Sequence, residues 1–465
     1  MKRTLIKDSF SKINKKIKIC GFVEKIRNHG GLIFFNVRDG SGRLQVVVSK
    51  SKKVIYNTVK TLTEESTIEV IGIVQKRPTG TQDKDTAFGD LEVSPIKIKL
   101  FSKARPLPFD FREREKVKEE VRLKYRYLEF RDKGFQENFW QRQMVISFFR
   151  NFLGKRGFLE IETPILSKST PEGARDFLVP SRLHPGKFYA LPQSPQQYKQ
   201  ILMVGGVERY FQIVRCFRDE DPRADRQAEF TQLDIEMAFI SQEEILNLVE
   251  EMYIKLVKKL FPSKKITQIP FPRLDARETI KKYKTDKPDL RKNKKDPDEL
   301  AFAFLVDFPM FEWKKEEKRW DAIHHPFTRP QTEDIKEIKA HPENILAYQY
   351  DFVLNGYEVG GGSLRSYKPE ILEAVFEVMG NSKEVIRKQF GHLLEAFEYG
   401  VPPHGGIAPG IDRFLMIVLN QNSIRDVIAF PKTGDGRDLM MDAPSEVSKD
   451  QLQELKIKIN KIKSK

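Results

Sequence analysis

The segment from residue 215 to residue 239, RCFRDEDPRADRQAEFTQLDIEMAF, constrains the fold more than any other part of the chain. Its first fifteen residues include nine charged side chains, and its end alternates between apolar and polar residues. Alternate side chains of a strand point to opposite faces, so this end predicts a strand with two unlike faces. The apolar face consists of Leu233, Ile235, Met237 and Phe239. The polar face consists of Phe230, Gln232, Asp234 and Glu236.

The loop before this strand is more highly charged than a chain reversal requires. Its charged residues are Arg218, Asp219, Glu220, Asp221, Arg223, Asp225 and Arg226. Such a density of charge beside a floor of carboxylates favours a site for a polyphosphate and its metal ions. A half-solvated edge strand is the simpler alternative for this segment taken alone.

A second pattern, YDFVLNGYEVGGGSLR, predicts a β-hairpin that turns at Asn355 and Gly356. In the simplest register Asp351 lies opposite Gly360, which brings Asp351 and Glu358 onto one face as diagonal neighbours. Two carboxylates so close repel each other unless a cation lies between them. Because Mg²⁺ binds through few protein carboxylates plus phosphates, the pair predicts a Mg²⁺ site, with a purely structural pair as the alternative.

A third pattern, GGIAPGIDRFLMIVLNQ, predicts an amphipathic helix that begins near Gly410. Arg413 then lies in the first turn, where free backbone N–H groups and the helix dipole already favour an anion. Taken alone, such a pattern more often indicates an arginine on the solvent-facing side of an amphipathic helix.

Residues 17–100 contain five short strands and one helical stretch, which fits a small barrel such as an OB-fold. Period-two geometry places Ile33, Phe35 and Val37 on one face and leaves Phe34 on a more polar face. With Arg27, Asn28 and Gln45 nearby, Phe34 predicts a base-stacking platform for single-stranded nucleic acid; a Phe packed under a loop is the alternative.

After residue 135 long helices alternate with strands, which indicates an α+β domain. The predicted divisions are a barrel domain at 1–104, a hinge at 105–135, a catalytic domain at 136–445 interrupted by a Lys-rich linker at 283–299, and a basic tail at 446–465.

The composition restricts the partners of the chain and its location. A net charge of +16 suits a polyanion such as RNA. Two cysteines, Cys20 and Cys216, are too few for a disulfide framework or a thiolate zinc site. The sequence shows neither a signal peptide nor a membrane-spanning apolar run, so we expect a cytoplasmic protein with no membrane partner.

Three segments, in chain order, resemble the signature motifs of class II aminoacyl-tRNA synthetases. They are GFLEIETPIL, FRDED followed by RQAEFTQLD, and GIAPGIDRFLMIVL. Further segments are similar to bacterial-type aspartyl-tRNA synthetases, so the likeness covers nearly the whole chain. They are GFVEKIRNHGGLIFFNVRDGSG, TPEGARDFLVP, LPQSPQQYKQILM, HHPFT and NGYEVGGGSLR.

The resemblance implies an antiparallel catalytic sheet flanked by helices, an OB-fold that reads the anticodon, and a homodimer joined through the first motif. It also implies that L-aspartate is activated with ATP and Mg²⁺ and transferred to tRNA(Asp).

The resemblance also assigns roles to individual residues. The implied catalytic groups are Arg218, Arg413 and Glu358, and the implied Mg²⁺ ligands are Asp351 and Glu358. The implied ATP-binding residues are Arg218, Asp219, Glu220, Gln227, Phe230, Glu358, Gly410, Ile411, Asp412 and Arg413. The implied aspartate-binding residues are Glu172, Gln196, Lys199, Arg218, Asp234, His324, His325 and Arg365. The implied anticodon-binding residues are Arg27, Asn28, His29, Phe34 and Gln45.

Two features depart from the bacterial-type pattern. Relatives usually insert a domain of roughly a hundred residues where this chain has only the linker at 283–299. His29 stands where enzymes restricted to tRNA(Asp) tend to have Leu, and His resembles relaxed enzymes that also charge tRNA(Asn). We therefore expect that the chain lacks the insertion and that it charges tRNA(Asn) as well.

Three other functions share parts of this pattern. An asparaginyl or lysyl synthetase has the same fold, although Lys199 and Arg365 favour an acidic substrate. A catalytically dead relative that binds RNA would not need Arg218, Asp351, Glu358 and Arg413. An amide-forming ligase would not need the amino-terminal barrel.

Overall fold

Five strands in the amino-terminal part of the chain close into a barrel with the order β1-β2-β3-β5-β4. The strands are β1 (Lys16–His29), β2 (Leu32–Asp39), β3 (Gly42–Ser49), β4 (Thr67–Lys76) and β5 (Leu91–Ser102). The predicted helical stretch is α1 (Lys53–Lys60). Ile33, Phe35 and Val37 point into the barrel and are at most 2% exposed. The barrel prediction is therefore confirmed.

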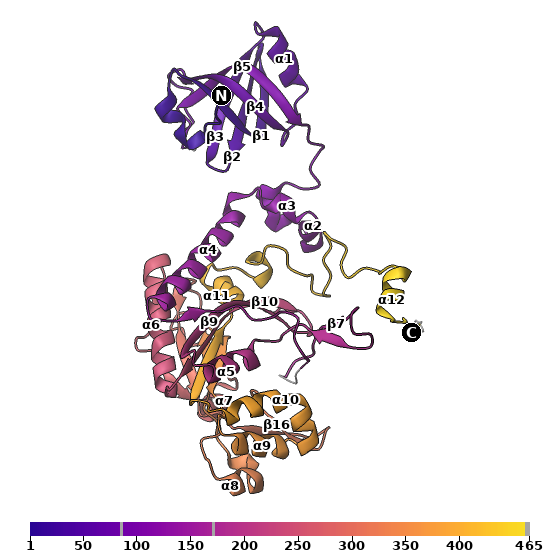
Figure 1. Ribbon diagram of the computed structural model, residues 1–465. Helices are drawn as coiled ribbons and strands as arrows, with labels where there is room; N and C mark the ends of the chain where they lie inside the picture. The colour runs from indigo at the N-terminus through magenta and orange to yellow at the C-terminus, as the bar shows by residue number, and fades with distance from the viewer. Residues whose placement is uncertain (84–86, 170–172, 461–465) are drawn as a thin grey trace. The chain divides into compact units, whose positions relative to one another are not determined.

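The computed structural model describes residues 1–83, 87–169 and 173–460. The chain forms two units, Met1–Arg114 and Glu115–Lys465 (Figure 1). Within the described residues, no helix is both long enough and apolar enough to cross a membrane.

The second unit is built on an eight-stranded sheet with the order β12-β14-β17-β18-β19-β10-β9-β6. The five neighbouring pairs from β14 to β9 are antiparallel, and the two outermost pairs are parallel. In sheet order the strands are β12 (Arg273–Asp275), β14 (Phe302–Val306), β17 (Gln349–Leu354), β18 (Tyr357–Leu364), β19 (His404–Pro409), β10 (Glu229–Ala238), β9 (Arg209–Phe217) and β6 (Leu159–Glu160).

Three helices pack on one face of this sheet: α4 (Lys133–Gly154), α6 (Gln242–Leu260) and α11 (Ile411–Val418). Their apolar residues form one core with inward-facing side chains of the sheet, including Leu233 and Ile235 of β10, which are fully buried. Since β10 alternates, its polar residues face the opposite side, where these helices leave the sheet uncovered. The predicted α+β architecture is therefore confirmed.

The remaining elements are short or lie around this framework. The helical ones are η1 (Ile6–Lys12), η2 (Phe111–Lys116), α2 (Glu119–Lys124), α3 (Arg126–Glu129), α5 (Gln196–Val204), α7 (Ala276–Tyr283), α8 (Ile335–Ala340), η3 (Pro342–Asn344), α9 (Pro369–Val378), α10 (Lys383–Glu398), η4 (Ile424–Asp426) and α12 (Lys449–Leu455). The strands are β7 (Leu178–Pro180), β8 (Phe188–Ala190), β11 (Lys265–Ile266), β13 (Glu299–Leu300), β15 (Phe311–Lys314) and β16 (Arg319–Ala322). Between α7 and β13 the chain forms no helix or strand, so only a short linker stands at the predicted place of the insertion.

Two details of the strands differ from the expectation. Phe239 is 66% exposed, because β10 ends at Ala238 and the chain turns at Phe239 with a φ of 55°. In the β17–β18 hairpin the turn at Asn355 and Gly356 is correct, but the register shifts by one residue next to it. Asp351 consequently pairs with Gly361 and not with Gly360.

Gly362 of β18 lies where the sheet is too tightly packed for any side chain. A Cβ atom there would lie 2.3 Å from the carbonyl oxygen of Gly406 and 2.5 Å from the ring of Tyr350. We expect Gly362→Ala to lower the free energy of unfolding by about 3 kcal/mol, because backbone and a buried ring must move. Urea unfolding followed by tryptophan fluorescence measures the second unit, since all three tryptophans lie in it.

Gly391→Ala is the matched control for this substitution. A Cβ atom at Gly391, within α10, would have no neighbour within 4 Å. Alanine favours a helix over glycine, so this variant should be as stable as the parent protein or more stable. Equal stability of the two variants would contradict the packing argument.

Candidate active site

The polar face of the sheet forms the floor of a cavity of about 480 Å³. Strands β10, β18 and β19 supply the floor, and the start of α5, the start of α11, the loop at 218–227 and the end of β16 with the three residues after it supply the walls. The predicted site residues that line the cavity are Gln196, Lys199, Arg218, Glu220, Gln227, Phe230, Asp234, His324, His325, Glu358, Arg365, Gly410, Asp412 and Arg413. The structure thus brings together residues that are more than two hundred positions apart in the chain.

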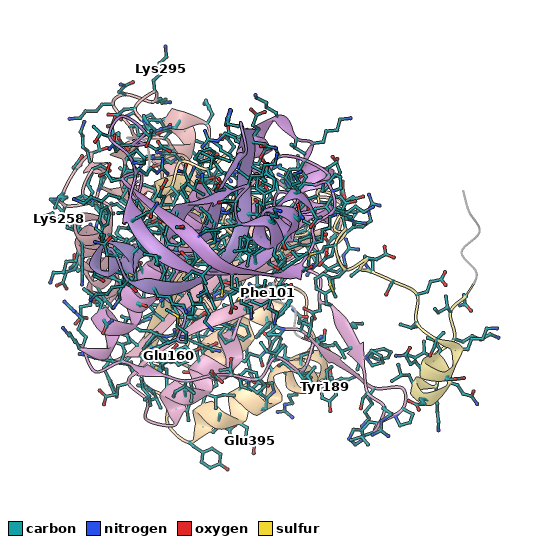
Figure 2. All side chains as sticks on the ribbon, turned by 90° about the horizontal axis from the view of Figure 1, so that it is seen from above. Phe101, Glu160, Tyr189, Lys258, Lys295 and Glu395 are labelled. Carbon is teal, nitrogen blue, oxygen red and sulfur yellow. The ribbon has the colours of Figure 1, made fainter. Side chains whose placement is uncertain are left out.

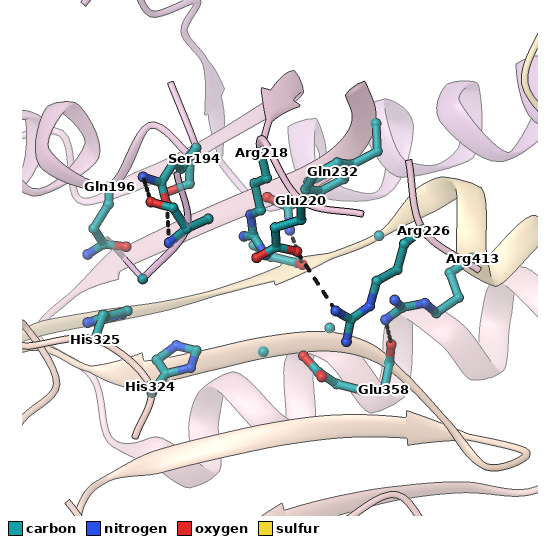
Figure 3. A pocket seen from close by; sticks show the side chains of 18 of the residues that line it. Ser194, Gln196, Arg218, Glu220, Arg226, Gln232, His324, His325, Glu358 and Arg413 are labelled. Atoms are coloured by element: carbon teal, nitrogen blue, oxygen red, sulfur yellow. Dashed lines mark hydrogen bonds and ion pairs between the residues drawn. The ribbon is translucent and has the colours of Figure 1, made fainter. Parts of the chain in front are cut away.

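One end of the cavity is rich in guanidinium groups. Figure 3 shows Arg218, Arg226 and Arg413 directed toward the same space. The guanidinium carbon of Arg218 lies 5.2 Å from the ring centre of Phe230. Its buried Nε has no hydrogen-bond partner among the described residues, which leaves a donor for an anion. The sequence placed Arg226 in the charged loop but gave it no role, since nothing in the sequence showed which loop side chains turn inward.

Arg413 lies in the first turn of α11, as predicted, but it is not free in this structure. Its Nη2 lies 3.3 Å from Oδ2 of Asp225, and its Nη1 donates to the backbone carbonyl of Glu358. An incoming phosphate group would therefore have to displace the Asp225 carboxylate from Arg413.

Of the predicted carboxylate pair, Glu358 lines the cavity beside these arginines, whereas Asp351 is buried and is not one of the lining residues. A Cβ atom built on Gly361 would lie 3.5 Å from Oδ1 of Asp351 and 3.5 Å from Oε1 of Glu358, so both oxygens border the space above this glycine. Burial and the neighbouring Glu358 carboxylate raise the pKa of Asp351 well above its ordinary value. No group of three or more metal-ligating side chains occurs in the described ranges. Two carboxylate oxygens that border one space are a donor set that would fit Mg²⁺, an ion that takes few protein carboxylates and completes its shell with phosphates and water.

The other end of the cavity contains four buried charges. Nζ of Lys199 lies 2.8 Å from Asp234 and 3.2 Å from Glu236. Arg365 donates two parallel hydrogen bonds to Glu236, at 2.9 and 3.0 Å. Burial raises the pKa of Asp234 despite Lys199. Burial alone would also raise the pKa of Glu236, but Arg365 and Lys199 outweigh it and hold that pKa at about 2.

Sequence reasoning placed Glu236 on the polar floor but assigned it no role. Its two oxygens hold Arg365 and Lys199 together, so it positions both predicted carboxylate-binding groups. The alternation of β10 could have indicated this role, because it puts Glu236 next to Asp234 on the same face of the strand.

The two adjacent histidines differ in their surroundings. His325 Nε2 accepts a hydrogen bond from Nη1 of Arg365 at 2.7 Å, and its Nδ1 lies 3.3 Å from the hydroxyl of Thr328. Both ring nitrogens of His325 are thus engaged, and it orients Arg365. Burial, helped by Arg365 and Arg218, lowers the pKa of His324 to about 3, so this ring is neutral where it borders the cavity.

Other predicted residues lie outside the cavity or are engaged by the protein. Ile411 is 1% exposed and packs in the core, so its side chain is not available to ATP. Asp219 borders an outer hollow with Arg175 and Arg223. Asp412 accepts a hydrogen bond from the backbone of Thr231 at 2.7 Å and another from Arg142, so it fixes the start of α11. Glu172 lies outside the described residues.

The barrel presents four of its five predicted residues on one rim. Arg27, Asn28 and His29 are exposed, and the ring of His29 lies edge-on to half-buried Phe34 at 6.3 Å. Gln45 differs, because it is 6% exposed and donates to Glu92 at 3.2 Å. Gln45 is paired with Glu92 of the neighbouring strand β5, a partner that the alternation of β3 alone did not reveal.

Comparisons with known proteins agree with this architecture. The family described as tRNA synthetases class II (D, K and N) matches residues 118–434, and an OB-fold nucleic acid binding domain matches residues 17–120. The aspartate--tRNA(Asp/Asn) ligase of Thermodesulfovibrio yellowstonii is 40% identical, over 96% of this chain and 98% of its own length. The corresponding ligase of Dictyoglomus turgidum is 41% identical, over 96% of each chain. These matches confirm the resemblance found in the sequence.

The solved structure of asparaginyl-tRNA synthetase from Pyrococcus horikoshii has the same fold. It superposes with a TM-score of 0.73 at 23% identity, and the match covers 93% of this chain and 98% of that one. The alignment with the T. yellowstonii relative runs over 581 positions, more than the 465 residues of this chain. Part of that relative therefore has no counterpart here, as expected for a missing insertion.

We expect Glu236→Gln to lower the free energy of unfolding at pH 7 by about 3 kcal/mol, because it leaves buried cations underpaired. The pKa of Glu236 falls from 4.5 to about 2 on folding, so its contribution is complete above pH 4.5 and is lost as the pH falls toward 2. Urea unfolding at several pH values should show a constant deficit above pH 5 that narrows in acid. The exposed Glu208→Gln, just before β9, serves as the control and should change stability by less than about 0.5 kcal/mol. A deficit that does not depend on pH would contradict this assignment.

We expect Asp351→Asn to increase the free energy of unfolding at pH 7 without Mg²⁺, by at least about 1 kcal/mol. A carboxyl group with a raised pKa destabilises the fold once the pH exceeds its ordinary value of 3.8, so the gain should vanish near pH 3. We also expect ATP with Mg²⁺ to increase the Tm of the parent protein, and the same substitution should abolish the part of this increase that depends on Mg²⁺. Thermal unfolding with and without Mg²⁺ measures both effects, with exposed Asp442→Asn as control. A less stable Asn variant would show that the two carboxylates do not repel each other.

Proposed function

We propose that the chain, which belongs to the class II tRNA synthetases (D, K and N), is an aspartate–tRNA ligase. It activates L-aspartate with ATP to give aspartyl-adenylate and pyrophosphate, and it transfers the aspartyl group to the 3′ end of tRNA. Because its tRNA substrates are used in translation, we also propose a cytoplasmic location. The observation that carries the proposal is one cavity with an arginine-rich end and an end that holds Lys199 and Arg365.

The arginine-rich end suits the triphosphate of ATP. Arg218 would hold the α-phosphate and Arg413 the γ-phosphate, with Phe230 stacked on the adenine. Mg²⁺ held by Asp351 and Glu358 would neutralise charge on the phosphates. The α-carboxylate oxygen of aspartate attacks the α-phosphorus in line, the bond to the bridging oxygen breaks, and pyrophosphate leaves. Such chemistry depends on positioning and charge neutralisation, which is what arginines and carboxylates in this arrangement provide.

The opposite end suits the side-chain carboxylate of aspartate. Lys199 and Arg365 offer only donors, so a carboxylate can accept from both, whereas the amide nitrogen of asparagine would meet them donor to donor. Charged donors left without an acceptor on the substrate side of such a buried site cost roughly 3 kcal/mol, or about a hundredfold in selectivity. Asp234 and Glu236 hold the two cations in place when no substrate is bound.

In the second step a hydroxyl of the terminal ribose of tRNA attacks the activated carbonyl, and AMP leaves. The barrel would recognise the anticodon through Arg27, Asn28, His29 and Phe34. Its exposed rim and the net charge of +16 both favour a polyanion. The two relatives named above are ligases for tRNA(Asp/Asn), which supports relaxed recognition here, and we assign it to His29.

The proposed enzyme is a homodimer. Exposed apolar side chains begin in β6 and continue onto the β7–β8 hairpin, where Ser167 pairs with Ala190. They are Leu159, Ile165, Leu166, Leu178 and Phe188. Figure 2 shows the hairpin that contains Tyr189 projecting from the second unit. An apolar surface of this kind is typical of a subunit contact.

The proposal is tested by ATP–pyrophosphate exchange with aspartate, asparagine or lysine as the only amino acid. Exchange should depend on aspartate, and Arg413→Ala should reduce it at least about a hundredfold, because transition-state charge is left without its partner. Exchange with asparagine or lysine alone would point to another member of the family. Adenylate formation without any transfer to tRNA would favour an amide-forming ligase.

The tRNA preference is tested by charging tRNA(Asp) and tRNA(Asn) side by side. The parent enzyme should charge both tRNAs. His29→Leu should lower kcat/KM for tRNA(Asn) about tenfold and should leave kcat/KM for tRNA(Asp) nearly unchanged. The same substitution at exposed His341, in the second unit, serves as the control. Rejection of tRNA(Asn) to the same degree as an unrelated tRNA would show that recognition is not relaxed.

A further inference from the structure

A line of three hydrogen-bonded side chains lies behind the aspartate end of the cavity. Nδ1 of His404 lies 2.8 Å from the carbonyl oxygen of Pro402, and its Nε2 lies 3.2 Å from Nε2 of Gln200. Oε1 of Gln200 lies 3.0 Å from Nε2 of Gln196. Gln200 and His404 are at most 1% exposed, whereas Gln196 lines the cavity. Two buried side chains therefore separate the cavity from a fixed backbone carbonyl.

The chemistry of the groups fixes the direction of each hydrogen bond. A backbone carbonyl only accepts, so the proton of a neutral His404 must be on Nδ1 and the lone pair on Nε2. The amide nitrogen of Gln200 must then donate to that lone pair, which turns its oxygen toward Gln196. The nitrogen of Gln196 must donate in turn. Each amide is thus held in one of its two orientations.

The neutral state of His404 follows from its surroundings. Burial lowers the pKa of its imidazole. Among the charged groups that face it, Glu236 opposes this effect, whereas Arg365 and Lys199 reinforce it. A cationic His404 would have two N–H groups and would have no acceptor to offer to Gln200.

As a result of these hydrogen bonds, the Gln196 amide turns its oxygen, Oε1, toward the cavity. No described residue donates a hydrogen bond to its Oε1, and Figure 3 shows Gln196 at the end of the cavity beside His325. The amino group of an amino acid is an ammonium, which only donates, so it requires an acceptor at this place. A reversed amide would offer it an N–H group.

We infer that His404 and Gln200 are positioning residues that hold the Gln196 amide with its oxygen toward the α-ammonium of the substrate. This inference rests on the proposed function and extends it, because it adds a line of neutral side chains anchored at Pro402 that orients one of the proposed aspartate-binding residues. The charged network at Lys199 and Arg365 recognises the other end of the substrate.

The decisive variant is Gln200→Met, which keeps the size of the side chain and removes both hydrogen bonds. The KM for aspartate in ATP–pyrophosphate exchange should increase about tenfold, while the KM for ATP stays unchanged. Succinate, the same four-carbon diacid without the amino group, should inhibit the parent and the variant with equal constants. Equal weakening of aspartate and succinate would overturn the inference, because it would show only a structural defect in the pocket.

Gln197→Met is the matched control. Gln197 is the next residue of α5, is 8% exposed and accepts a hydrogen bond from His392 in a separate small hollow. Its substitution should leave the KM for aspartate unchanged. A tenfold increase here would mean that any change in α5 disturbs the site, and the inference would fail.

A second variant, Gln200→Glu, gives a pH signature that loss of packing would not give. Its carboxylate can still accept from Gln196, but it faces the lone pair of His404 unless that ring takes up a second proton. The ratio of the variant's KM for aspartate to that of the parent should therefore be near one at pH 6 and increase about tenfold toward pH 8.5. A ratio that does not change with pH would contradict the proposed direction of the hydrogen bonds.

The position of the proton on His404 can be tested without any activity. The ¹⁵N spectrum of histidine-labelled protein should show His404, assigned by its loss in His404→Gln, as a neutral ring protonated at Nδ1. A ring protonated at Nε2 would overturn the inference even if aspartate is the substrate. If the parent enzyme shows no aspartate-dependent exchange, the proposed function fails, and this spectrum still decides whether the line of hydrogen bonds exists.

Discussion

Four buried charges hold the amino-acid end of the cavity together. Lys199 on α5 reaches Asp234 and Glu236 on β10, and Glu236 binds Arg365 at the end of β18. All four side chains are at most 2% exposed, so each charge is stable only while its partners stay in place. The network therefore ties a helix and two strands into one arrangement.

The same strand makes this arrangement possible and connects it to the core. The alternation of β10 places Leu233 and Ile235 against α4, α6 and α11, and Asp234 between them on the opposite face. A shift of one residue in the pairing of β10 would bury the wrong face on both sides. The apolar core thus sets the register on which the charged network depends. A shift in that register would lose the stabilisation from the core packing and from the charged network.

The sequence predicted the elements that depend on local patterns and missed those that depend on distant partners. The turn at Asn355 and Gly356 and the start of α11 at Gly410 follow from short-range rules, and both are correct. The register shift beyond the hairpin, the hydrogen bond between Gln45 and Glu92 of β5, and the role of Glu236 depend on strands or side chains that sequence patterns do not pair. Alternation along one strand indicates which face a residue is on, but it does not indicate what covers that face.

The missing insertion is compatible with a complete site. None of the residues that line the cavity lies between 276 and 299, where the chain has only α7 and a linker without helix or strand. The strands on either side of this linker are fixed by pairing within the unit, since β12 pairs with β14 and β11 pairs with β13. The cost of closing a loop rises only slowly with its length, so a domain can be present or absent at such a point with little effect on the sheet. The chemistry proposed for the cavity therefore draws none of its lining residues from this segment.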